Sequence, residues 1–341
     1  MKLCILLGGP SAEREVSLQS GFGMARALAS RGHDVTLLDP ATGREMRLEE
    51  FHADPPKTEH PTAKELGEFS QGNIVLESLM SNAVREAEIV VLGLHGVPGE
   101  DGLIQSVLEL QNKRYTGSNA RSSALCIDKH YTKVILEHAG IRVPRGTIVA
   151  QSDHPQQRHA AWELANLEFG FPLVIKPNDQ GSTVGLTILR EASQDAFNRA
   201  VDLALEYSTK ALIEEFIEGR ELTVSILGRE ALPVLEIETK DGFYDYHHKY
   251  TPGMSFHTCP ANLPSELASG IQANALKAFE ACGCRGYGRV DFRLHPDGRY
   301  YCLEINTLPG MTSTSLIPDA AKAAGISFEN LCERIVAEAL D

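Results

Sequence analysis

The stretch between Gly286 and Ser315 constrains the fold more than any other part of the chain. Two segments in which apolar and polar residues alternate, 286–294 and 299–306, flank the turn His-Pro-Asp-Gly at 295–298. Alternation on both sides of a Pro-Asp-Gly turn predicts an antiparallel β-hairpin. The two strands should therefore lie side by side.

Four polar side chains are expected on one patch of this hairpin. Residues two apart on a strand point the same way, so Arg289 shares a face with Asp291, and Glu304 shares one with Asn306. Carboxylate and amide oxygens suit Mg²⁺ better than Zn²⁺, and Mg²⁺ leaves positions open for phosphate oxygens. The alternative is a solvated sheet face with cross-strand ion pairs. The loop at 308–315 favours the metal site, because such loops supply N–H donors to anions.

Length and charge narrow the class of protein. A chain of 341 residues is too long for one ordinary core and predicts two or three domains. The net charge of -14 argues against nucleic acid or an anionic membrane as the main partner, since both need a basic face. No apolar run approaches the roughly 18 residues of a membrane span, so we expect a cytoplasmic protein. The seven cysteines are interpreted as reduced structural thiols.

The first 120 residues follow the pattern of a doubly wound α/β domain. Strand 2–7, a glycine turn, a helix over 17–31 and strand 33–39 form a parallel unit, and a second apolar strand covers 88–94. Ligands bind beyond the carboxyl ends of such strands, where Glu13, Ser17 and His95 fall. A dehydrogenase is poorly supported, because the dinucleotide fingerprint G-x-G-x-x-G is missing.

The rest of the chain has a different organisation. After a helix over 122–138, strand 172–177 carries Lys176 and runs into the loop Asn-Asp-Gln-Gly-Ser-Thr-Val-Gly before strand 186–189. A glycine loop between antiparallel strands can cover phosphates with its N–H groups. Glu214, near the end of an apolar strand, can accept a hydrogen bond from a ribose or a base. A long loop is expected over 239–263 and a terminal helix over 328–340.

Six segments, spread in order over nearly the whole chain, match one known family. They read G-G-P-S-A-E-R-E-V-S, L-H-G-V-P-G-E-D-G, K-P-N-D-Q-G-S-T-V-G, F-Y-D-Y-H-H-K-Y, G-Y-G-R-V-D and L-E-I-N-T-L-P-G-M-T-S-T-S-L. Together they resemble the D-alanine:D-alanine ligases of the ATP-grasp superfamily. The resemblance implies an α/β and α+β fold, in which an N-terminal doubly wound domain (1–120) binds the first substrate. A two-part ATP-grasp fold follows, with the glycine loop in 121–218 and the metal and catalytic residues in 219–341.

The resemblance also implies a reaction. ATP would phosphorylate one D-alanine, and the amine of a second would attack the D-alanyl phosphate, giving D-alanyl-D-alanine for peptidoglycan synthesis. Asp291, Glu304 and Asn306 would hold two Mg²⁺ ions, for which Mn²⁺ can substitute. Arg289 and the N–H of Gly310 would stabilise the tetrahedral intermediate. The alternatives are D-serine or D-lactate as second substrate, and a non-catalytic nucleotide-binding protein.

The remaining roles concern the nucleotide and the two substrates. The resemblance implies phosphate contacts for Lys129, Lys176 and Lys249, and adenine or ribose contacts for Glu214 and Glu221. It gives Glu13 the ammonium of the first D-alanine, His95 a place near that substrate's carboxylate, and Ser315 the carboxylate of the second. Ser182 and Tyr250 would tie the loops shut with Glu13, and Lys249-Tyr250 favours D-alanine as second substrate. A homodimer is also implied.

Overall fold

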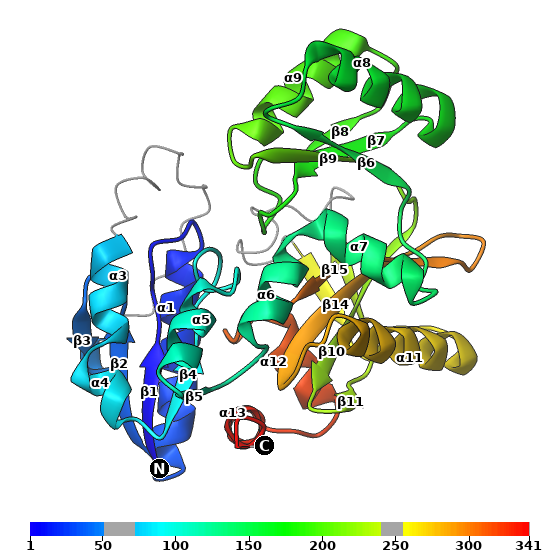
Figure 1. Ribbon diagram of the computed structural model, residues 1–341. Helices are drawn as coiled ribbons and strands as arrows, with labels where there is room; N and C mark the ends of the chain where they lie inside the picture. Colours follow the sequence, from blue (N-terminus) through cyan, green and yellow to red (C-terminus); the bar gives the residue numbers. More distant parts are fainter. Residues whose placement is uncertain (51–71, 240–254, 341) are drawn as a thin grey trace.

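The computed structural model describes residues 1–50, 72–239 and 255–340, and in these residues the strands form three sheets (Figure 1). The first sheet has the order β3-β2-β1-β4-β5. Its strands are β1 (Lys2–Leu6), β2 (Asp34–Asp39), β3 (Arg44–Met46), β4 (Ile89–Leu92) and β5 (Arg114–Tyr115). The helices with it are α1 (Arg14–Ser30), α3 (Gly72–Leu79), α4 (Asn82–Glu86) and α5 (Leu103–Leu110). All pairings are parallel except β2 with β3. The expected doubly wound domain is therefore confirmed.

The apolar strands β1 and β4 lie at the centre of this sheet. Every residue of β4 and all but Lys2 of β1 are buried, as expected for parallel strands covered on both faces. Gly21 on α1 lets the helix lie close to the strand end, because a Cβ there would be 2.4 Å from the Cβ of Leu7. The glycine in the middle of the helix is thus explained by packing.

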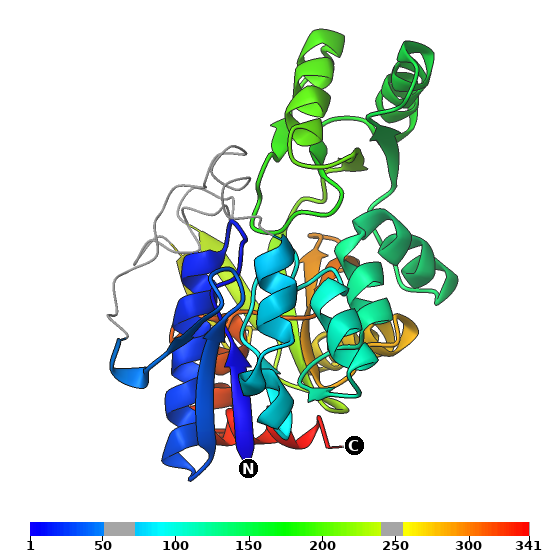
Figure 2. The same ribbon diagram turned by 60° about the vertical axis from the view of Figure 1, so that its left-hand side comes forward.

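The second sheet stands apart from the other two, with both of its helices on the far face (Figures 1 and 2). Its order is β6-β9-β7-β8 and its pairings are antiparallel. Its strands are β6 (Gly146–Ala150), β7 (Leu173–Pro177), β8 (Thr187–Leu189) and β9 (Lys210–Glu215). The helices are α8 (Pro155–Leu164), continued by a π-helical turn over Ala165–Phe169, and α9 (Gln194–Leu205). The face without helices therefore turns toward the rest of the molecule.

The third sheet contains the predicted hairpin. Its order is β13-β12-β10-β14-β15, with β11 paired to β10. Its strands are β10 (Arg220–Leu227), β11 (Glu230–Ala231), β12 (Leu235–Thr239), β13 (Ser255–Thr258), β14 (Tyr287–Leu294) and β15 (Tyr300–Asn306). The helices α11 (Ser265–Ala281), α12 (Leu316–Ala323) and α13 (Phe328–Ala337) complete the chain. Strands β14 and β15 pair antiparallel, so the hairpin is confirmed.

The helix expected over 122–138 is in fact two helices, α6 (Ala120–Ile127) and α7 (Lys129–His138). Asp128 breaks it, because its extended backbone ends α6 while its carboxylate accepts the N–H of Tyr131 at 3.0 Å and caps α7. Cys126 and Leu136 from these helices lie in one core with residues of the third sheet. The expected central range, 121–218, therefore contains elements that pack on two different sheets.

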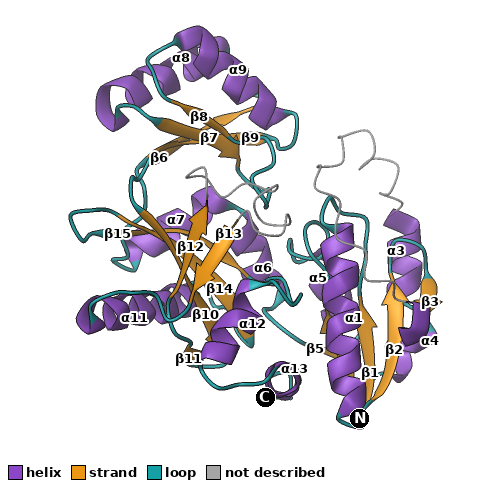
Figure 3. Ribbon diagram, turned by 180° about the vertical axis from the view of Figure 1, so that it is seen from behind, coloured by secondary structure: helices purple, strands orange, loops and turns teal. Residues whose placement is uncertain are grey.

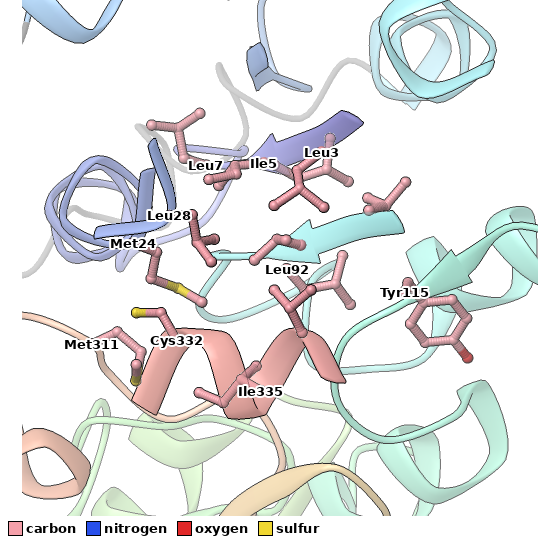
Figure 4. Packing of buried hydrophobic residues seen from close by; sticks show 14 of the residues in the cluster. Leu3, Ile5, Leu7, Met24, Leu28, Leu92, Tyr115, Met311, Cys332 and Ile335 are labelled. Carbon is pink, nitrogen blue, oxygen red and sulfur yellow. The ribbon is translucent and has the colours of Figure 1, made fainter. Parts of the chain in front are cut away.

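The C-terminal helix packs against the first domain. Residues of α13, including Cys332 and Ile335, share one buried cluster with β1, β4 and α1. Figure 3 shows α13 between α12 and α1, and Figure 4 shows Cys332 near Met24. The range 219–341 is thus not a self-contained unit. Strand β13 also lies inside the segment 239–263 that was expected to be a loop.

In the described parts of the chain, none of the helices combines the length and apolar character needed to span a membrane.

Candidate active site

The hairpin brings the predicted patch together across its two strands. Arg289 lies opposite Asn306, and Asp291 lies opposite Glu304. The Arg289 guanidinium donates to both carboxylate oxygens of Asp291, with Nε–Oδ1 2.8 Å and Nη2–Oδ2 2.9 Å. Thr223, on the neighbouring strand β10, donates its hydroxyl to Oδ1 of Asp291 at 2.6 Å. Sequence reasoning missed Thr223, although alternation along β10 could have placed it on this face.

The oxygen ligands of this patch fit Mg²⁺. Two carboxylates and an amide oxygen on neighbouring strands form a hard donor set of the kind that Mg²⁺ shares with phosphate oxygens. Among the residues that the structure describes, no group of three or more His, Cys, Asp or Glu side chains forms a complete metal cage. An ion at this patch would take its remaining ligands from phosphate oxygens or water, as Mg²⁺ usually does.

A cavity between the second and third sheets contains the residues expected to bind the nucleotide; we name it the lysine cavity. It is lined from both sheets and from the glycine loop, and its walls include Lys129, Lys176, Glu214, Glu221 and Asp291. Arg293 lies opposite Glu221 and donates to the Glu221 carboxylate at 3.1 Å. Arg293 also lines the cavity. The four nucleotide residues expected in the described ranges are thus brought together.

Two lysines of this region share one carboxylate. Lys176 Nζ lies 2.9 Å from Oε2 of Glu214, and Lys133 Nζ contacts Oε1 of the same group. Burial lowers the pKa of Lys176 to about 8. Burial, together with the charge of Lys176, also holds the pKa of Lys133 well below its usual range. Sequence reasoning missed Lys133, although its spacing of four from Lys129 places both on one helix face.

Lys129 connects three parts of the site. Its Nζ donates to the carbonyl of Gln180 at 2.7 Å and lies 3.3 Å from Oε2 of Glu304. Its own N–H donates to the carbonyl of Asn178 at 3.1 Å. Lys129 thus links helix α7 to the glycine loop and to the hairpin.

The glycine loop reaches across to the first domain. Ser182 and Thr183 have φ of 53° and 62°, a left-handed conformation that side chains rarely adopt. In this conformation the Ser182 hydroxyl donates to Oε1 of Glu13, which stands at the start of α1. Strained backbone of this kind is often found at binding sites. The predicted contact between Ser182 and Glu13 is present.

A second, smaller cavity adjoins the first; we name it the Glu13 cavity. Of the described residues expected to bind the substrates or to act in catalysis, all but Ser17 line it. Its walls include Glu13, His95, Ser182, Arg289, Glu304, Asn306, Gly310 and Ser315. Ser182, Arg289 and Glu304 line both cavities. The two cavities therefore meet at the hairpin patch.

Ser17 and Ser315, both expected to contact substrates, make hydrogen bonds within the protein. Ser17 is fully buried, donates its hydroxyl to the carbonyl of Gly93 at 2.8 Å, and lines neither cavity. The expectation that Ser17 faces a ligand is therefore not met, because the helix turns this side chain toward the sheet.

Ser315 Oγ accepts the N–H of Thr312 at 3.0 Å. A Cβ on Gly310 would lie 2.7 Å from this Ser315 oxygen. Gly310 thus leaves room for Ser315.

The expected residues Lys249 and Tyr250 lie outside the described residues.

Two family models together match most of the chain. The model described as D-ala D-ala ligase N-terminus matches residues 2–118, and that described as D-ala D-ala ligase C-terminus matches residues 135–337. The chain belongs to the D-alanine–D-alanine ligase family. The first matched region corresponds to the first domain. The second runs from α7 to α13 and includes the described strands of the second and third sheets.

Curated relatives match this D-alanine–D-alanine ligase family member over its full length. A D-alanine–D-alanine ligase from Desulforamulus reducens is 40% identical over 346 aligned residues, which cover 100% of this chain and 99% of the relative. One from Geotalea uraniireducens is 38% identical over 339 residues, which cover 99% of this chain and 95% of the relative. The resemblance stated from the six segments is confirmed.

Solved structures of the same family confirm the expected ATP-grasp fold. The D-alanine–D-alanine ligase from Bacillus anthracis complexed with ATP matches with a TM-score of 0.77 and 28% identity, covering 100% of this chain and 97% of that one. A D-Ala:D-Ser ligase from Enterococcus faecalis matches with a TM-score of 0.78 and 29% identity, covering 99% of both chains.

Proposed function

We propose that this protein is an ADP-forming ligase that joins two D-alanine molecules through a D-alanyl phosphate intermediate. The observation that carries the proposal is the meeting of the two cavities at Arg289 and Glu304. Phosphate-binding lysines stand on one side of this junction, and Glu13 and Ser315 stand on the other. A phosphoryl group held by the lysines can therefore reach a carboxylate held near Glu13.

The first step transfers the γ-phosphoryl group of ATP to the carboxylate of the first D-alanine. A carboxylate oxygen forms the new P–O bond, and the bond to ADP breaks. Lys129 and Lys176 hold the phosphates and spread their negative charge, which aligns the transfer. Mg²⁺ held by Asp291, Glu304 and Asn306 would neutralise phosphate charge in this step. Glu13 receives the ammonium group of the substrate.

The second step forms the peptide bond. The neutral amine of the second D-alanine attacks the acyl carbon. The tetrahedral intermediate then collapses with cleavage of the C–O bond, and inorganic phosphate leaves carrying the proton that the amine loses. Arg289 and the Gly310 N–H line the Glu13 cavity, where they can donate to the oxygen that becomes negative. Ser315 receives the carboxylate of the second substrate.

The contact between Ser182 and Glu13 excludes water during both steps. It joins the glycine loop to the first domain over the junction of the two cavities. An acyl phosphate hydrolyses readily, so a closed loop directs it to the amine. We further propose that the protein acts in the cytoplasm and forms a homodimer. Sedimentation of the purified chain would test the homodimer.

Phosphate release from ATP and Mg²⁺ tests the proposed function. The enzyme receives D-alanine, L-alanine, D-alanine with D-serine, or D-alanine with D-lactate, and each product is identified by mass. We expect release that requires D-alanine and yields mainly D-alanyl-D-alanine. Glu304→Gln should abolish it, whereas Glu163→Gln, on the exposed face of α8, should not. Preferential capture of D-serine or D-lactate would assign a different second substrate and overturn the proposal.

A further inference from the structure

Lys133 is a buried lysine to which neither cavity gives access. It lies on α7, one helical turn after Lys129, and its side chain is 7% exposed. Its Nζ contacts Oε1 of Glu214, whose side chain is 3% exposed. Lys133 does not line the lysine cavity, although Glu214 does. Lys133 therefore stands behind Glu214, on the side away from the nucleotide.

Glu214 has one negative charge and two ammonium partners. Lys133 approaches Oε1 from helix α7, and Lys176 approaches Oε2 from strand β7. Lys176 lines the lysine cavity and is 13% exposed, so a phosphate can reach it. A buried carboxylate that loses its only counter-ion is strongly destabilised. With Lys133 in place, Lys176 can leave Glu214 without this penalty.

The position of Lys133 is fixed by the start of its helix. The Lys129 N–H donates to the carbonyl of Asn178 at 3.1 Å, and the His130 N–H donates to Oδ1 of the same residue at 2.9 Å. Asn178 directly follows β7, which carries Lys176. Helix α7 and strand β7 are thus tied together at one end, and this connection holds both lysines in place around Glu214.

We propose that Lys133 is a positioning residue: as the fixed counter-ion of Glu214, it frees Lys176 to bind a nucleotide phosphate. The inference rests on the proposed function only in taking a nucleoside triphosphate as the ligand of the lysine cavity. Without Lys133, Glu214 keeps Lys176 as its partner, and the phosphates lose one charged donor. Glu214 keeps its place beside Lys176, so the adenine or ribose contacts expected of Glu214 and Glu221 are kept.

Binding of ATP and of adenosine to Lys133→Met separates these two effects. ATP affinity should fall roughly tenfold to a hundredfold, the range expected when one charge-assisted hydrogen bond is lost. Adenosine affinity should stay within about twofold, because adenosine has no phosphate. Lys113→Met is the matched control: Lys113 donates to the carbonyl of Ala87 at 2.9 Å in the first domain, and the cavity does not include it. It should leave both affinities unchanged.

A second variant provides the rescue. Glu214→Gln removes the charge that retains Lys176, so Lys133→Met in that background should change the ratio of ATP to adenosine affinity by less than about twofold. If Lys133 had only a structural role, Lys133→Met would lower the affinities for both ATP and adenosine. The same loss would then be seen when Lys133→Met is added to Glu214→Gln. This comparison still applies if Lys133→Met alone does not fold, because the double variant is compared with Glu214→Gln and not with the wild type.

The outcomes distinguish this inference from the proposed function. Unchanged ATP affinity in Lys133→Met, or an equal loss of ATP and adenosine affinity, overturns the role of Lys133. A wild-type enzyme that binds ATP but makes no D-alanyl-D-alanine overturns the proposed function and leaves the binding comparison valid.

Discussion

His95 Nδ1 lies 2.8 Å from the carbonyl oxygen of Leu308, and this contact joins the first domain to the loop that follows the hairpin. A carbonyl oxygen only accepts, so Nδ1 carries a proton, and in the neutral imidazole Nε2 is then the acceptor. Nε2 lies 2.9 Å from the hydroxyl of Ser20, which therefore donates to it. The same hydroxyl accepts the N–H of Met311 at 3.0 Å. One buried serine thus fixes both the histidine and the loop.

Ser20→Ala should lower turnover more than it lowers nucleotide binding. The substitution leaves the N–H of Met311 and Nε2 of His95 without partners, at a cost of about 1–3 kcal/mol for each buried group. We expect kcat to fall roughly tenfold with little change in the KM for ATP, because the loop with Gly310 and Ser315 moves. Steady-state kinetics check this. Ser30→Ala is the control, on the same helix, where the hydroxyl donates to the carbonyl of Ala27.

Thr223→Val should weaken metal binding. The valine has the same shape but cannot donate to Asp291, which then keeps Arg289 to orient it. Removing such an outer partner typically costs about tenfold to a hundredfold in metal affinity. Titration of Mn²⁺ in the presence of a non-hydrolysable ATP analogue measures the change. Ser225→Ala on the same strand should have no effect, because the buried Ser225 hydroxyl has no hydrogen-bond partner among the described residues.

Ser182→Ala should uncouple ATP use from dipeptide formation. The substitution removes the hydroxyl that holds the glycine loop to Glu13. Water then reaches the acyl phosphate, so the ratio of phosphate released to dipeptide formed should rise above one. The ratio is measured by quantifying both products in the same reaction. A ratio of one, as expected for the exposed control Ser152→Ala, would mean that this contact does not exclude water.

The rate with limiting ATP should fall as pH rises through about 8. Burial depresses the pKa of Lys176 to about 8, so its ammonium, which binds phosphate, is lost above that pH. The charged groups that influence it are Glu214, Glu304, Glu221, Lys129 and Lys133. A pH profile of kcat/KM for ATP shows the decline. It should disappear in Lys176→Arg, since a guanidinium stays protonated.

Lys176 should increase the free energy of unfolding at alkaline pH, where it lowers the rate at limiting ATP. The folded pKa of Lys176 is about 8 and its ordinary value is 10.5, so the unfolded chain binds more protons between these limits. The free energy of unfolding therefore gains from this residue as pH rises from about 8 to 10.5. Denaturant unfolding of the wild type and of Lys176→Met is compared at several pH values. The difference between their free energies of unfolding should change between about pH 8 and 10.5, and no change over that range would mean that another group is responsible.

Two glycines of α1 should respond oppositely to alanine. At Gly21 the new Cβ would meet the Cβ of Leu7 at 2.4 Å, so Gly21→Ala should lower the free energy of unfolding by about 1–3 kcal/mol. At Gly23 the nearest atom would be 3.6 Å away, an ordinary contact. Gly23→Ala should therefore stabilise the protein by up to about 1 kcal/mol through helix propensity. Thermal unfolding midpoints compare the two variants.

The sequence by itself determined the hairpin and its polar patch. Alternation placed Arg289 with Asp291 and Glu304 with Asn306, and a short turn left one way to pair the strands. Continuous apolar strands, with a glycine turn and a helix between them, determined the parallel first sheet in the same way. These features could be predicted because periodicity and turn chemistry are local properties. Six segments taken together were enough to identify the family.

Only the tertiary structure decided which distant groups share a partner. The contacts of Lys133 with Glu214, of Glu13 with Ser182, and of His95 with Leu308 each join separate parts of the chain. The tertiary structure also turned Ser17 away from the cavity and packed α13 into the core of the first domain. A side chain's local pattern says which face it occupies, whereas its partner depends on how the sheets and helices pack against one another. That packing is a property of the whole chain.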